Sequence, residues 1–193
     1  MSEKIKKQTV NTILEIALYV ISGLAFLYFI MNGRYEKCFR AALIIIVLLL
    51  LRGLLAWTKS ELSSPLRFSI LLFITITMLL ANLFNMYDVI PHLDKIEHLL
   101  SGVILFFVGQ FIFEKITRKH QMITIPRSLM IWFSLLFAIA MAGLWEVYEF
   151  STDKLFGLTS QNNSLVDTML DIICGTVGAI GAVLFLVFKD KKQ

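Results

Sequence analysis

Residues 128–150 read SLMIWFSLLFAIAMAGLWEVYEF, an apolar run that closes with two glutamates three positions apart. Such a run is about as long as an α-helix must be to cross the hydrocarbon core of a bilayer, which takes roughly 20 residues. Charged side chains within a span are costly and usually functional. The stretch therefore predicts a membrane-spanning helix and makes Glu146 and Glu149 the first candidates for a site.

Similar runs recur along the whole chain, which has 193 residues and is 58% hydrophobic. A soluble domain spreads its apolar residues periodically, and β-barrel strands give short alternating segments, whereas this chain gathers them in long blocks. We therefore predict an all-α membrane protein in which residues 1–193 form a single integral membrane domain. About six transmembrane helices are expected in a compact bundle, over residues 9–31, 38–57, 68–86, 94–114, 128–150 and 165–188. The first is interpreted as a retained span, because its apolar run shows no clear signal-peptide cleavage pattern.

Basic residues lie mostly between these blocks, so they indicate topology and give no sign of a nucleic-acid partner. Of the 18 Lys and Arg residues, twelve lie at the two termini and in the second and fourth connections. Five lie in the other connections, and Arg52 lies within a span. Because cytoplasmic segments carry the excess of Lys and Arg, both termini are expected in the cytoplasm. The two cysteines, Cys38 and Cys174, do not have the spacing of metal ligands.

Two charges lie inside the first two spans. Glu15 and Arg52 are expected at similar depth if these helices are antiparallel neighbours. Intramembrane charges tend to pair, which favours a Glu15–Arg52 ion pair. The alternative is that Arg52 extends alone to the interface.

The sixth span contains glycines spaced by three, at Gly175, Gly178 and Gly181. Small residues allow helix backbones to approach closely within a membrane. This helix is therefore expected to be central in the bundle.

Ionisable residues gather where the fourth span begins, the fifth ends and the sixth begins. They form three pairs, Asp94 with His98, Glu146 with Glu149, and Asp167 with Asp171. Members of a pair are three or four residues apart and so share a helix face. With the predicted topology, all three pairs lie at the extracytoplasmic boundary. The deeper members are His98, Glu146 and Asp171, about one helical turn further into the bilayer.

Three interpretations of this cluster are open. Polar residues are common at helix ends, which accounts for Asp94 and Asp167. A divalent metal ion is a second interpretation, with the six residues Asp94, His98, Glu146, Glu149, Asp167 and Asp171 as candidate ligands. Oxygen-rich ligands suit Mg, Ca or Mn, and a single His leaves Zn or Fe open. The third is acid–base chemistry without a metal, with His98, Glu146 and Asp171 as the catalytic candidates.

The order of these motifs also resembles a known pattern. D-K-x-x-H at 94–98, W-E-x-x-E at 145–149 and D-x-x-x-D at 167–171, followed by a Gly-rich span, resemble the YjdF-like membrane-spanning proteins of bacteria. The pattern is similar, more loosely, to VanZ-like proteins, which have Gln and Asn where this chain has Glu149 and Asp171. The resemblance implies a six-span bacterial inner-membrane protein with a polar site made by its last three helices, and the VanZ-like name implies a role at the cell envelope through teicoplanin resistance.

Three functions compete on these grounds. The first is an enzyme, metal-dependent or acid–base, that acts on an envelope lipid or lipid-linked head group. The second is a small proton- or cation-coupled transporter, ranked lower because interrupted helices at the bilayer midplane are not evident. With so few spans, it would be expected to be dimeric. The third is a non-enzymatic envelope factor whose partners bind the connection at 151–164.

Overall fold

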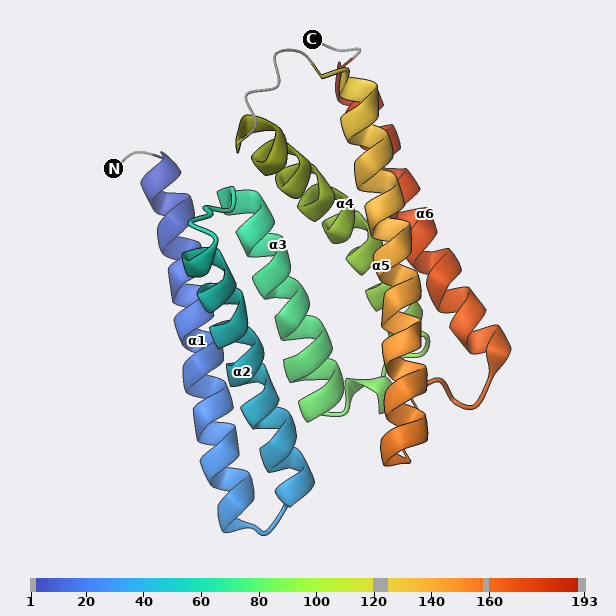
Figure 1. Ribbon diagram of the computed structural model, residues 1–193. Helices are drawn as coiled ribbons and strands as arrows, with labels where there is room; N and C mark the ends of the chain where they lie inside the picture. The colour runs from blue at the N-terminus through green and yellow to red at the C-terminus, as the bar shows by residue number, and fades with distance from the viewer. Residues whose placement is uncertain (1–2, 120–124, 158–159, 191–193) are drawn as a thin grey trace. The chain divides into compact units, whose positions relative to one another are not determined.

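The computed structural model of the chain describes residues 3–119, 125–157 and 160–190. Within these ranges the chain is helical and contains no strand. The elements are α1 (Glu3–Met31), α2 (Tyr35–Trp57), α3 (Ser64–Ile74) with its π-helical continuation η1 (Thr75–Leu83), the short 3₁₀ helix η2 (Met86–Asp88), α4 (Leu93–Lys119), α5 (Arg127–Phe156) and α6 (Leu165–Asp190) (Figure 1). Six helices are long and apolar enough to cross a membrane, counting α3 with η1 as one. The prediction of a six-helix, all-α membrane protein is confirmed.

Helix α5 runs well past the predicted end of its span. The fifth span was expected to end at residue 150, but α5 continues to Phe156, and Gly157 ends it in the left-handed conformation with φ of 68°. Within this extension the hydroxyl of Ser151 donates to the carbonyl of Val147, and that of Thr152 to the carbonyl of Tyr148. Hydropathy predicts only the apolar part of a helix, whereas backbone hydrogen bonding continues into the polar zone. The predicted 151–164 connection is therefore shorter than expected.

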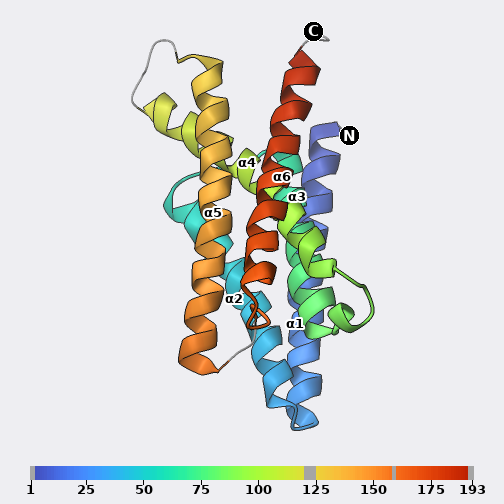
Figure 2. The same cartoon turned by 90° about the vertical axis from the view of Figure 1, so that its right-hand side faces the viewer.

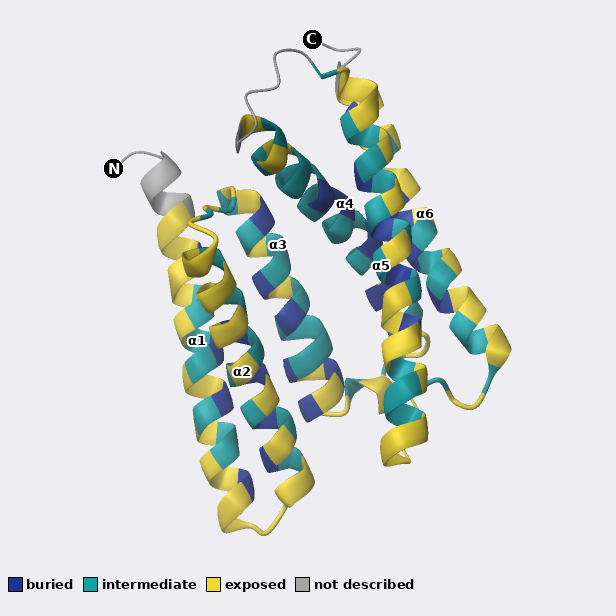
Figure 3. Ribbon diagram, in the orientation of Figure 1, coloured by how far each residue is buried: buried dark blue, intermediate teal, exposed yellow. Residues whose placement is uncertain are grey.

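The helices form two compact units, residues 1–93 and 94–193, which are described one at a time. In the first unit α1 packs against α2 and α3, and η1 packs against α2. Leu18, Ile44, Leu48 and Leu71 are among the most completely buried side chains of its core. Figure 3 shows buried positions on the facing sides of these helices and exposed positions on the outer sides.

Basic side chains at the start of α2 have a structural use. The ammonium of Lys37 donates to the carbonyl of Leu83 at 3.0 Å, and Arg40 Nη1 donates to the carbonyl of Asn82 at 2.9 Å. The last carbonyls of a helix have no partner within the helix. Lys37 and Arg40 therefore cap the end of η1. Both belong to the side of the membrane that is predicted to carry fewer basic residues.

Of the two alternatives left open for Arg52, the ion pair with Glu15 is not the one that the structure contains. Glu15 pairs with Arg67 at the start of α3, and Arg52 is exposed. Sequence spacing gave Glu15 and Arg52 similar depth along their helices. Which helix faces which depends on helix rotation, and that rotation puts α3 beside the Glu15 face of α1.

A buried amide one turn before Glu15 supplies the first testable prediction. Asn11 is 1% exposed, and its Nδ2 donates to the carbonyl of Ser64 at 2.9 Å and to its hydroxyl at 3.0 Å. Polar contacts between membrane helices contribute about 0.6 to 1.7 kcal/mol. Asn11→Leu is expected to lower the free energy of unfolding by about 1 kcal/mol in an SDS titration of the micellar protein. Thr12→Val is the matched control, because Thr12 is exposed and its hydroxyl donates to the carbonyl of Gln8 in its own helix. An equal loss in both variants would contradict the prediction.

Close backbone contact between α4 and α6 defines the second unit. A Cβ added at Gly102 would lie 1.9 Å from the carbonyl oxygen of Gly175, and one at Gly178 would lie 2.0 Å from that of Leu99. Figure 2 shows α4 crossing behind α6. The close-packing expectation therefore holds for Gly175 and Gly178, but Gly181 faces open space.

Candidate polar site of α4, α5 and α6

The second unit brings the polar ends of its three helices together. Helices α4 and α6 start at the end of the unit where α5 finishes (Figure 1). Asp94 and Asp167 lie in the first turns of α4 and α6, where carboxylates interact favourably with the helix dipole. The hydroxyl of Ser164 accepts a hydrogen bond from the Asp167 amide at 3.2 Å and so fixes the start of α6.

Lys95 links α4 to α6. Its ammonium lies 2.6 Å from Asp167 Oδ1, 2.6 Å from Asp171 Oδ1 and 3.1 Å from Asp94 Oδ2. Lys95 is absent from the site predicted by sequence, although the D-K-x-x-H motif contains it and its spacing of three from His98 puts both on one face. Charge balance could have indicated Lys95, because three neighbouring carboxylates need a cation.

His98 is the point at which all three helices meet. Its Nε2 lies 3.4 Å from Asp94 Oδ1, 3.7 Å from Asp171 Oδ1 and 4.0 Å from Glu146 Oε1. The deeper member of each predicted pair is also buried, with exposed fractions of 8% for His98, 4% for Glu146 and 3% for Asp171. The structure therefore brings together one imidazole and carboxylates from α4, α5 and α6.

Glu146 has two different oxygen environments. Gln161, in the segment before α6, donates its Nε2 to Glu146 Oε2 at 3.2 Å and to the Glu146 carbonyl at 3.0 Å. The other oxygen, Oε1, is buried and accepts no hydrogen bond from the described residues. Sequence reasoning missed Gln161, because nothing in hydropathy or helical spacing indicates where a connecting segment folds back.

The structure places the six predicted ligands at different distances from the centre. Asp94, His98 and Asp171 each offer an atom within 4.8 Å of the others, as three metal ligands would. Asp167 is held instead by Lys95 and by Asn162, whose Nδ2 donates at 2.8 Å. Glu149 accepts a hydrogen bond from Trp145 Nε1 at 2.9 Å and makes no ion pair with His98 or Lys95 among the described residues.

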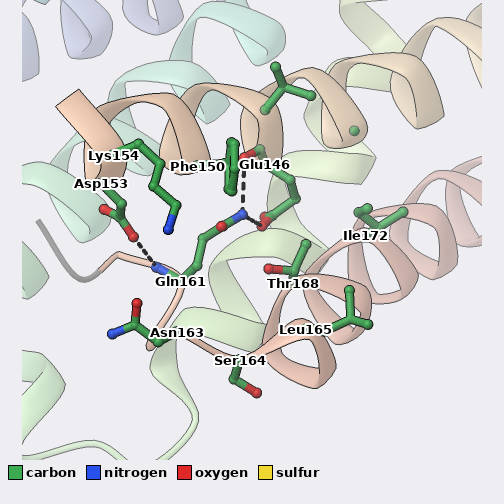
Figure 4. A pocket seen from close by; sticks show the side chains of 12 residues that line it. Glu146, Phe150, Asp153, Lys154, Gln161, Asn163, Ser164, Leu165, Thr168 and Ile172 are labelled. Atoms are coloured by element: carbon green, nitrogen blue, oxygen red, sulfur yellow. Dashed lines mark hydrogen bonds between the residues drawn. The ribbon is translucent and has the colours of Figure 1, made fainter.

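A cavity of about 520 Å³ adjoins this cluster between α5, α6 and the segment that joins them. Glu146 and Gln161 line it beside polar Asn163 and Thr168, and Phe150 and Ile172 supply apolar surface. Figure 4 shows Glu146, Gln161 and Lys154 around this space. Glu146 is thus shared between the His98 cluster and an adjoining cavity.

The cluster carries an excess of negative charge. Four carboxylates, on Asp94, Glu146, Asp167 and Asp171, gather around one ammonium and one imidazole. Buried carboxylates persist only when paired, hydrogen-bonded or coordinated to a cation. The arrangement can therefore hold a cation or exchange protons.

The fold and the site together define a polytopic membrane protein with a buried acidic and imidazole cluster at one end of its last three helices. Over residues 13–192 the chain matches the family described as Predicted membrane protein (DUF2238), and it belongs to that family. A similar protein, named Uncharacterized protein, comes from Thermotoga maritima and is 32% identical over 95 residues, which cover 49% of this chain and 47% of that protein. The match thus spans about half the length of each, and no solved structure matches the chain.

Proposed function

We propose that Asp94, His98, Glu146 and Asp171 bind a divalent metal ion, and that this centre acts on the polar head group of an envelope lipid. The observation that carries the proposal is Glu146 Oε1, a buried carboxylate oxygen that accepts no hydrogen bond from the described residues and lies 4.0 Å from His98 Nε2. A buried carboxylate oxygen without a hydrogen bond is costly, and a coordinated cation removes that cost. Three carboxylates and one imidazole form a donor set suited to Mn or Mg, with Zn or Fe also compatible.

The surrounding residues support a role for the centre beyond structure. A bound divalent ion would supply a Lewis acid for a reacting oxygen atom. Asp94 Oδ1 and Asp171 Oδ1 lie 3.4 Å and 3.7 Å from the same nitrogen of His98, Nε2. Gln161 holds Glu146 from the opposite side. These contacts hold His98 and Glu146 in fixed positions. They leave some oxygen atoms of the cluster for a metal ion or a transferred proton.

The lipid part of the proposal rests on position. Asp94 and His98 lie in the first two turns of α4, and Asp171 lies in the second turn of α6. The ends of membrane spans are where head groups meet the hydrocarbon core. Trp145 and Tyr148, with ring centroids 5.3 Å apart, fit the aromatic belt found at that depth. The YjdF-like resemblance supports a bacterial cytoplasmic membrane, and the count of basic residues supports an extracytoplasmic position for the site.

Metal analysis of the purified chain tests the proposal. After exposure to Mn²⁺ or Zn²⁺ and removal of free ion, we expect about one tightly bound ion per chain, since the cluster forms one centre. His98→Ala is expected to lose the ion, because it removes the ligand at which the three helices meet. His92→Asn is the matched control, an exposed histidine outside the cluster whose left-handed backbone, with φ of 57°, asparagine tolerates. Metal content near zero in the wild-type protein would contradict the proposal.

A further inference from the structure

The cavity beside Glu146 is also lined by polar residues, Lys154 and Gln161 among them, that the proposed metal centre does not use as ligands. We propose that it binds the head group of a lipid that carries both a primary amine and a phosphate, with the ammonium at Glu146 and the phosphate at Lys154. This assignment rests on the proposed function and names its substrate class. It also places the amine of the head group, and not its phosphate, next to the His98 cluster.

The inner wall of the cavity is anionic. Glu146 is 4% exposed and presents Oε2 on the side where Gln161 donates at 3.2 Å. An ionised carboxylate oxygen can accept further hydrogen bonds beyond this one. Because the neighbouring cluster is rich in carboxylates, its field attracts a cation even when a divalent ion is bound. A primary ammonium has both the charge and the N–H donors that this wall requires.

The rim of the cavity is cationic. Lys154 lies in the last turn of α5, and its ammonium stands 5.7 Å from the ring centroid of Phe150. Among the described residues, Lys154 has no carboxylate within ion-pair distance. The adjacent Asp153 is already held by the amide groups of Ser160 at 2.9 Å and Gln161 at 3.1 Å. Lys154 is therefore available to an anionic group of a ligand.

Glu146 and Lys154 are set too far apart to pair with each other. Eight residues on one helix correspond to about 12 Å along its axis, although a lysine side chain leans back toward the helix N-terminus and shortens this gap. A ligand with a cationic group at one end and an anionic group at the other spans such a pair. The lining is thus complementary to a zwitterionic head group in one orientation.

Apolar residues around the cavity favour a lipid over a soluble zwitterion. Phe150, Val147 and Leu165 line it and are 53%, 59% and 77% exposed. In a membrane these surfaces contact acyl chains, which would follow the head group from the bilayer. A cavity of about 520 Å³ is ample for a head group alone.

Isothermal titration calorimetry of the full-length, metal-loaded chain in detergent tests this inference. The probes are dihexanoyl phosphatidylethanolamine, its phosphatidylcholine and phosphatidylglycerol counterparts, and soluble phosphoethanolamine. The ethanolamine lipid is expected to bind at least about tenfold more tightly than the other two lipids, since its head group alone combines a positive charge with N–H donors to a carboxylate. It is also expected to bind more tightly than phosphoethanolamine. Lys154→Met is expected to weaken its binding about fivefold.

Lys189→Met, an exposed lysine near the opposite end of α6, is the matched control and is expected to leave lipid binding unchanged. Equal affinity for the three lipids, or equal losses in the two lysine variants, would overturn the head-group assignment. Phosphoethanolamine binding as tightly as the lipid would overturn the lipid source. Metal content is measured on the same samples, so that the two proposals can be told apart. A preference for the ethanolamine lipid without bound metal would contradict only the metal centre. Bound metal without a lipid preference would contradict only this inference.

Discussion

Asp171→Asn is expected to remove the divalent ion from the protein while the helices remain folded. Asp171 is 3% exposed, and its Oδ1 lies 2.6 Å from the Lys95 ammonium and 3.7 Å from His98 Nε2. The amide keeps the shape of the side chain but loses the charge that holds the cation. Changes to groups that merely support metal ligands already cost about 10- to 100-fold in affinity, so loss of a ligand is expected to exceed about 100-fold. Equilibrium dialysis with Mn²⁺ gives the affinity, and circular dichroism gives the helix content.

Lys95→Met is expected to change the affinity for the divalent ion in the opposite direction. Its ammonium competes for the carboxylates of Asp94 and Asp171, so its removal is expected to strengthen binding of the divalent ion.

Asp88→Asn is the matched control for Asp171→Asn, because Asp88 is exposed outside the cluster, and it is expected to change nothing. Equal affinities for Asp171→Asn and the wild-type protein would show that this carboxylate does not coordinate the ion.

Gly178→Ala is expected to be a strongly damaging change in the second unit, although it adds only one methyl group. Its Cβ would lie 2.0 Å from the carbonyl oxygen of Leu99, which belongs to the backbone of α4 and has no side-chain freedom to move away. Overpacking costs about 1–3 kcal/mol, and contact with backbone favours the upper part of this range. Moving α6 away from α4 also draws Asp171 away from His98, so weaker metal binding is expected together with the lower free energy of unfolding.

Gly181→Ala is the control on the same helix. A Cβ at Gly181 meets nothing within 4 Å, so the change is expected to be neutral or to stabilise the helix by up to about 1 kcal/mol. Denaturant titrations of the micellar proteins measure both variants. Similar unfolding free energies for the two alanine variants would mean that α4 and α6 do not approach as closely as the Leu99–Gly178 contact indicates.

Helix positions were largely predictable because the membrane imposes one strong physical constraint. Backbone groups in a bilayer must be satisfied internally, so an apolar run of about 20 residues has few alternatives to a helix. The same constraint does not fix helix ends in the polar zone. This explains why α5 runs to Phe156 beyond its predicted end at residue 150.

The candidate site was only partly predictable. Spacing of three or four residues put Asp94 with His98 and Asp167 with Asp171 on common faces, and depth grouped them with Glu146. Spacing within one helix carries no information about the partner helix. The ammonium of Lys95 between three carboxylates, and Gln161 folded back onto Glu146, depend on contacts between segments far apart in sequence.

Hydropathy and helical periodicity are local properties, so they were enough to predict a membrane protein of six helices with its ionisable residues concentrated at the ends of the last three. Tertiary structure alone decided which charges meet. It paired Glu15 with Arg67 and not with Arg52, and it brought His98, Glu146 and Asp171 together while Glu149 turned to Trp145. The physical reason is helix rotation and close approach, which depend on packing such as the Gly178–Leu99 contact and on no single segment of the chain.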